Sequence, residues 1–131
     1  MPIAYARDDQ RRLITLTVTE PYSVDDILGV IDRQAAEDTW GYAMLYDLRT
    51  ATHVSTFEEL RQMAARVEVL AGGRERGPVG MAIASVPEQF RMALAYTRLT
   101  SGLEKVEVLL TALQLDDWLA RNARRGPSRQ S

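Results

Sequence analysis

The stretch Tyr42-Ala-Met-Leu-Tyr-Asp-Leu-Arg49 decides the fold that we predict. It is apolar on both faces and rich in strand-forming residues, which is typical of a parallel strand buried within a sheet. Asp47 and Arg49 lie at its carboxyl end, where the strand passes into a loop. In open α/β sheets, ligands and partners bind at the carboxyl ends of strands. We therefore predict a central strand with a polar site at its end.

The residues before this strand predict a hairpin and one helix. Ile3–Ala6 is a short strand, and Arg12–Thr19 alternates apolar and polar residues with the period of two that is typical of strands. Ser23 suits the N-cap of a helix, because two aspartates follow it in the first turn, where the helix dipole favours acids. Apolar residues then recur at helical spacing, which predicts a helix from Val24 to about Glu37.

The residues after the central strand predict a regular alternation of helices and strands. Ser55 or Thr56 caps a helix that runs to Gly72, because each hydroxyl has a glutamate three residues later, the pattern of a capping box. Arg74–Pro78 is predicted to be an exposed connection. The remaining strand, helix, strand and helix are predicted at Val79–Val86, Pro87–Thr100, Val106–Leu110 and, after a cap at Thr111, up to about Asn122.

The order of elements is therefore ββαβαβαβα. Strands that alternate with helices pair in parallel through right-handed crossovers. We predict an α/β fold with a single mixed, mostly parallel sheet of about five strands and about four helices. The strand that begins at Val79 is small at Gly80, Ala82 and Ala84, which predicts another element packed closely on it.

Composition limits the class of protein. The chain has 131 residues, the size of one domain, and 46% of them are hydrophobic, enough to build a core. It has no cysteine, which excludes disulfides and thiol catalysis. No apolar run approaches the roughly 20 residues that span a bilayer, and the N-terminus has no signal-peptide pattern. We therefore predict a soluble, cytoplasmic protein without a transmembrane segment.

Charge is unevenly distributed along the chain. The net charge is −2, but the segment Arg121–Ser131 carries four arginines and no acid, which leaves −6 on the preceding residues. An acidic body argues against a nucleic-acid partner. We predict one domain over residues 1–122 and a disordered basic tail over residues 123–131.

The polar residues near the expected carboxyl edge match no catalytic motif. Asp47, His53 and Ser85 can be drawn as a triad with Glu88 nearby, but nothing in the sequence supports that geometry. His53 is the only histidine, and one histidine without cysteine does not make a zinc ligand set. Asp47 is expected to pair with Arg49 or to cap loop amides. We predict no enzyme activity, no metal and no cofactor.

These features together resemble the SpoIIAA-like, or STAS-like, domains, a group named after a bacterial anti-sigma-factor antagonist. The likeness covers Pro2–Asn122. It is carried by the opening hairpin, the helix after Pro21-Tyr22-Ser23, the central strand, the capped helix at Ser55-Thr56 and the closing Asp117-Trp118-Leu119. The resemblance implies a mixed sheet with helices packed on it and no enzyme chemistry.

The resemblance also implies a site for phosphate. In STAS regulators a phosphorylatable serine lies at the start of the helix that follows the central strand, and the matching positions are Ser55 and Thr56. The family places an aspartate before that serine, whereas Val54 and Ser55 precede the two positions here. The alternative is that Ser55 or Thr56 simply caps the helix.

Two functional hypotheses follow. The first is a non-enzymatic regulatory or protein-interaction module with an unknown protein partner. Its contact surface is the Asp47–Thr56 loop and the helix start after it, with the neighbouring Ser85–Gln89 turn as a further candidate. Its candidate partner or phosphate site consists of Asp47, Arg49, His53, Ser55 and Thr56. The alternative is a binder of a small apolar or acyl, lipid-like ligand between sheet and helices. Met44, Met81 and Met92 would leave adaptable space for it.

Two further expectations concern packing. The helix that begins at Pro87 is apolar on two stripes, which predicts that something else covers it. We predict a homodimer with Met92, Tyr96 and Leu99 at its interface. Tyr42 and Tyr46 lie four residues apart, hence on one face of the central strand, where they line a pocket or pack in the core.

Overall fold

The structure is a computed structural model, and it describes residues 3–51, 53–84 and 86–123. The elements along the chain are β1 (Ile3–Asp8), β2 (Leu13–Val18), α1 (Val24–Ala36), β3 (Ala43–Asp47), α2 (Phe57–Ala71), β4 (Val79–Ala82), α3 (Pro87–Leu99), β5 (Val106–Leu109) and α4 (Ala112–Asn122). Their order is the predicted one.

The five strands form one mixed sheet with the spatial order β1-β2-β3-β4-β5. β1 and β2 are antiparallel, and the other three pairs of neighbours are parallel. The predicted α/β fold is therefore confirmed. The predicted central strand is β3, the middle strand of the sheet, and its residues from Ala43 to Tyr46 are buried.

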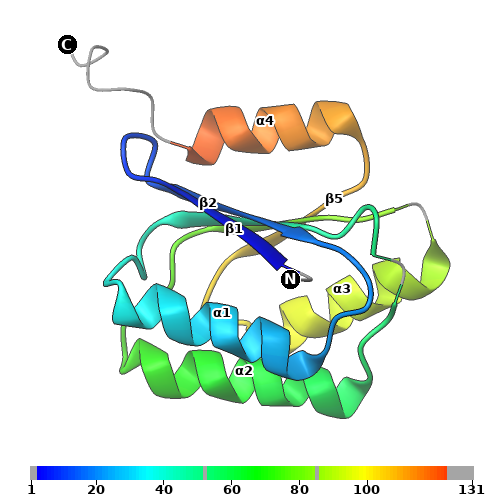
Figure 1. The fold of residues 1–131 in the computed structure, drawn as a ribbon, viewed down its shortest axis with the longest axis horizontal. Coiled ribbons are helices and arrows are strands. Elements are labelled where there is room, and N and C mark those ends of the chain that lie inside the picture. The colour runs from blue at the N-terminus through cyan, green and yellow to red at the C-terminus, as the bar shows by residue number, and fades with distance from the viewer. Residues whose placement is uncertain (1–2, 52, 85, 124–131) are drawn as a thin grey trace.

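The helices lie in two unequal layers (Figure 1). α1, α2 and α3 cover one face of the sheet, and α4 lies alone on the other. Each crossover moves the chain to the next strand in the same direction, so right-handed connections place all three crossover helices on one face. The strand order never reverses, and the sheet therefore lacks the crevice at which doubly wound sheets bind ligands.

The smaller core lies under α4 and confirms the close packing predicted at Gly80. A β-carbon placed on Gly80 would lie 2.9 Å from Cε2 of Trp118. Leu115 and Trp118 of α4 pack there on Leu45 and on Leu109 of β5. Gly80 is thus the residue that lets the indole ring lie flat on the sheet.

The prediction that Arg74–Pro78 is an exposed connection holds for Arg74 and Glu75 but is wrong for Arg76. The side chain of Arg76 is fully buried, and its guanidinium donates to Oε1 of Glu104 at 2.9 Å and to Oε1 of Gln34 at 2.7 Å. It also lies 5.3 Å from the ring of Trp40. Because these groups satisfy its charge and its donors, Arg76 ties the loop before β4 into the main core.

The residues proposed for a dimer face are also corrected. Met92 and Tyr96 lie in the main core of the subunit, and Leu99 packs against that core. The buried residues of α3 are Gln89, Met92, Ala93 and Tyr96. The buried face of α3 thus matches neither of the two apolar stripes predicted from the sequence. It includes a glutamine, which a search for apolar residues does not reveal.

Other differences are smaller. The strand predicted to reach Val86 ends at Ala82, since the backbone N–H of Ala84 donates to the side chain of Gln89 at 2.8 Å and the chain turns toward α3. Of the predicted tail, Ala123 is described and buried, and residues 124–131 lie outside the described residues.

Candidate functional site

The strand ends of β2 to β5, with the loops and helix starts that follow them, form the carboxyl edge of the sheet. At this edge Asp47 pairs with Arg49, as predicted. The guanidinium donates to both carboxylate oxygens at 2.9 Å, and the backbone N–H of Arg49 donates to Oδ1 at 3.2 Å. These bonds from Arg49 hold the pKa of Asp47 below its usual value. Both groups are therefore engaged with each other.

Thr56, rather than Ser55, caps α2. The Thr56 hydroxyl accepts from the backbone N–H of Glu59 at 3.1 Å, and the Glu59 carboxylate accepts from the backbone N–H of Thr56 at 2.8 Å. Ser55 is instead buried, and its backbone N–H donates to Sδ of Met92 at 3.3 Å. The two neighbouring positions thus have different surroundings, since Thr56 is exposed and Ser55 faces inward.

His53 joins two loops of the carboxyl edge. The Tyr22 hydroxyl donates to the backbone carbonyl of His53 at 3.1 Å, and the two rings meet edge to face with centroids 5.2 Å apart. The backbone N–H of His53 donates to the carboxylate of Glu20. The loop before α1 is therefore tied to the loop before α2, and the imidazole itself is on the surface.

Gln89 fixes the neighbouring strand ends from inside. Its amide donates to the carbonyls of Leu48 and Ala51, at 3.1 and 2.5 Å, while its oxygen accepts from Ala84. This fully buried side chain connects the loops after β3 and β4. The sequence placed Gln89 in a candidate contact turn but did not predict this buried role. A lone glutamine in the first turn of a helix resembles an ordinary surface residue.

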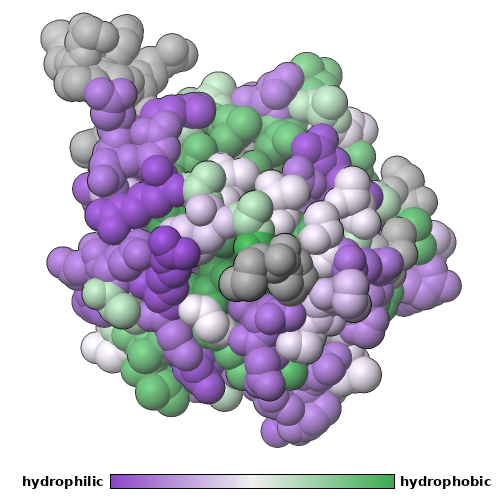
Figure 2. Space-filling model, viewed as in Figure 1, coloured by the Kyte–Doolittle hydropathy of each residue, from purple (hydrophilic) through white to green (hydrophobic). Residues whose placement is uncertain are grey.

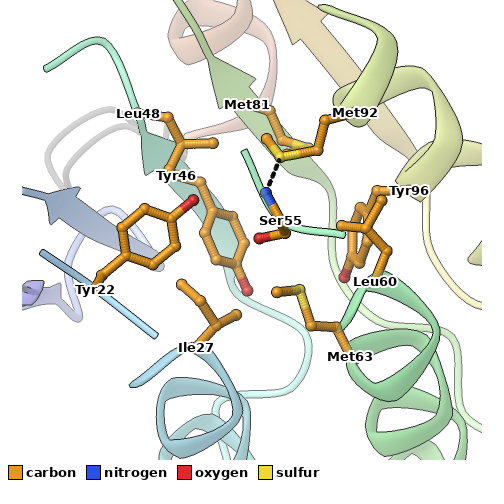
Figure 3. A pocket seen from close by; sticks show the side chains of 10 residues that line it. All are labelled: Tyr22, Ile27, Tyr46, Leu48, Ser55, Leu60, Met63, Met81, Met92 and Tyr96. Atoms are coloured by element: carbon orange, nitrogen blue, oxygen red, sulfur yellow. Dashed lines mark hydrogen bonds between the residues drawn. The ribbon is translucent and has the colours of Figure 1, made fainter. Parts of the chain in front are cut away.

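A narrow pocket of about 30 Å³ opens beneath these loops (Figure 3). Its walls are apolar or aromatic side chains and one serine, contributed by both loops, by β3 and β4, and by all three helices of the larger layer. They are Tyr22, Ile27, Tyr46, Leu48, Ser55, Leu60, Met63, Met81, Met92 and Tyr96. Of the methionines expected to leave space, Met81 and Met92 line the pocket, and Met44 lies elsewhere in the core.

The inner wall of the pocket adjoins the buried ion pair. The Tyr46 hydroxyl accepts from the guanidinium of Arg76 at 3.2 Å. Burial raises the pKa of Tyr46 and of Tyr96, and for Tyr96 the nearby Glu104 carboxylate raises it further. Both phenols therefore stay protonated at neutral pH. Tyr42, the other tyrosine on this face, lies in the core and donates to Asp9 at 2.7 Å.

The geometry does not support a catalytic triad of Asp47, His53 and Ser85. Asp47 is bonded to Arg49, and His53 contacts Tyr22 and Glu20. Ser85 lies outside the described residues. Within the described ranges, no group of three or more histidine, aspartate or glutamate side chains is placed to hold a metal ion. No helix among them has the length and hydrophobicity to cross a bilayer.

Comparisons with protein-family models, with curated proteins and with solved structures find no match to this chain. The resemblance to STAS-like domains therefore stays a prediction.

Proposed function

We propose that this chain is a non-enzymatic interaction module, of the kind that STAS-like domains represent, and that its carboxyl edge is the surface that contacts a protein partner. The observation that carries the proposal is the position of the exposed apolar side chains. Five large apolar residues are exposed among the described residues: Phe57, Val69, Phe90, Leu110 and Leu113. Four of these, all except Val69, lie at the carboxyl edge.

These four residues follow three adjacent strands. Phe57 is the first residue of α2 and is 59% exposed, and Phe90 lies in the first turn of α3 and is 38% exposed. Leu110 follows β5 directly, and Leu113 lies in the first turn of α4. The carboxyl ends of β2 to β5 lie on the right in Figure 1, and Figure 2 shows apolar residues among the polar surface along that rim. Exposed apolar groups along one edge of a sheet are candidates for a protein-binding surface.

The site around Phe57 gives the surface a defined shape. Thr56 caps α2 beside it, and the Glu20 and Tyr22 contacts hold the preceding loop. A preformed surface costs little conformational entropy on binding, which favours a specific partner. Of the predicted phosphate positions, exposed Thr56 is accessible for modification, whereas Ser55 is buried behind Met92.

The test is to isolate the protein with its bound partners from cells that express it, as wild type and as the double variant Phe57→Ser with Phe90→Ser. We expect the double variant to lose the specific partner, because both aromatic contacts are removed while the fold is retained. Val69→Ser is the matched control, since Val69 is 74% exposed near the opposite end of α2. Retention of the same partner by the double variant would contradict the proposal.

A further inference from the structure

The pocket under the carboxyl edge has a property that the interaction surface does not explain. It is lined by three methionines from three different elements, Met63 of α2, Met81 of β4 and Met92 of α3. Their side chains converge in Figure 3. Methionine is unbranched and adopts many rotamers, so a wall made of methionines changes shape without movement of the backbone.

One polar group in the pocket has a weak partner. The backbone N–H of Ser55 donates to Sδ of Met92 at 3.3 Å, and the dashed line in Figure 3 marks this bond. A thioether is a weak acceptor. An oxygen atom in the place of that sulfur would form a stronger hydrogen bond with the same N–H group. The pocket thus holds a directed donor that Met92 satisfies only in part.

The size and charge of the pocket restrict what enters it. Its volume of about 30 Å³ equals the share of about one water molecule in the liquid, whereas an apolar cavity that binds benzene measures about 150 Å³. An occupant therefore needs the Met92 side chain to move aside. None of the ten described lining residues is charged. An ionised ligand would lose its hydration there without gaining a partner.

Tyr22 is the lining residue that comes from the loop before α1. Its hydroxyl donates to the His53 carbonyl and also lies within hydrogen-bonding reach of the Ser55 side chain, and its ring meets the edge of the His53 ring. Tyr22 is half-buried and belongs to a loop, so its side chain is able to swing toward solvent. A swing of Tyr22, together with displacement of Met92, would widen the path from the pocket to solvent.

From these observations we propose that the pocket binds a small uncharged molecule with one ring or a short chain and a single oxygen acceptor. The apolar part occupies the space between the methionines, and the oxygen replaces Sδ of Met92 as the acceptor for the Ser55 N–H group. This site is separate from the contacts of Phe57 and Phe90 with a partner, and it does not depend on them.

The test uses the methionines as reporters. The four described methionines divide into three that line the pocket and Met44, which is buried outside it. Protein labelled with ¹³C at the methionine methyl groups is titrated, by NMR, with acetophenone, with ethylbenzene and with benzoate. Acetophenone carries a neutral oxygen acceptor, ethylbenzene lacks it, and benzoate is charged.

We expect acetophenone to shift the resonances of Met63, Met81 and Met92 in a saturable way while Met44 stays unchanged. The dissociation constant of ethylbenzene should be about fivefold higher than that of acetophenone, because ethylbenzene lacks one neutral hydrogen bond. Benzoate should cause no shift. The proposal is overturned if acetophenone moves none of the three resonances, if it moves Met44 equally, or if ethylbenzene binds as tightly.

Two variants locate the hydrogen bond. Met92→Leu keeps the volume of the side chain but removes the sulfur, so the preference for acetophenone over ethylbenzene should increase. Met92→Ala opens the pocket, and both uncharged probes should bind more tightly than to the wild type. Unchanged binding of both probes to Met92→Leu would overturn the proposed exchange at Ser55, even if Met92→Ala does not fold.

Discussion

Arg76 and Arg49 each pair with a carboxylate, but the two pairs differ in burial. The side chains of Arg76 and Glu104 are fully buried, whereas that of Arg49 is 48% exposed. Removal of one partner from a buried pair leaves an uncompensated charge, while an exposed charge is solvated by water. The same residue type therefore has different energetic roles at the two sites.

Arg76→Ala should lower the free energy of unfolding by about 3–5 kcal/mol, because the Glu104 carboxylate would lose its counter-charge within the core. Arg49→Ala is the matched control and should cost less than about 1 kcal/mol. Urea denaturation of the two variants measures both values. Equal losses for the two variants would show that the Arg76 pair is not the buried contact described above.

Thr56 and Ser55 offer a second comparison between single residues. Thr56→Ala should cost about 1 kcal/mol of stability, because the Glu59 amide loses the acceptor that caps it. Amide hydrogen exchange of Glu59 is the direct readout. Its protection should fall in Thr56→Ala and persist in Ser55→Ala, and loss of protection in Ser55→Ala alone would mean that Ser55 is the cap.

At the scale of elements, α4 is attached to the sheet through few contacts, and the close approach of Trp118 to Gly80 is central among them. Gly80→Ala should reduce stability by about 1–3 kcal/mol, since the new methyl group would push the indole and its helix outward. Gly29→Ala in α1 is the control. A β-carbon there meets nothing within 4 Å, and helix propensity predicts a gain of about 1 kcal/mol. A stable Gly80→Ala protein with unchanged unfolding would contradict this packing.

The helices and strands were predictable because their signals are local. Apolar runs and periodic patterns located the elements, and the capping boxes at Ser55 or Thr56 and at Thr111 located two helix starts. Arg76 could not be recognised in this way, since its partners Gln34 and Glu104 lie 42 and 28 residues away in the sequence. The buried face of α3 was misplaced for a related reason. Gln89 belongs to that face because its side-chain amide donates to the loop carbonyls of Leu48 and Ala51, a contact between distant parts of the sequence.

The candidate site was predictable in position but not in detail. The position of Asp47 and Arg49 after the central strand located the carboxyl edge, and their pairing was expected. The strand order was not predicted, and it is the adjacency of β3, β4 and β5 that brings Phe57, Phe90 and Leu110 to one rim. The inward orientation of Ser55 depends on Met92 of another helix, a contact that the local sequence does not encode.

At the scale of the whole molecule, the sheet places the starts of three helices at one end. Because the strand order does not reverse, α1, α2 and α3 all begin at the carboxyl edge and on the same face. Their first turns and the loops before them make up the exposed surface, and the pocket lies directly beneath it. Val69, near the far end of α2, has no such neighbours among the exposed apolar residues described.

The central claim is that a protein partner contacts the carboxyl edge. The most direct measurement is photo-crosslinking in living cells that express the chain with a benzophenone amino acid at position 57 or, as the control, at position 69. We predict a discrete crosslinked partner from position 57 and none from position 69. Crosslinks that are absent at position 57, or that appear equally at both positions, would contradict the claim.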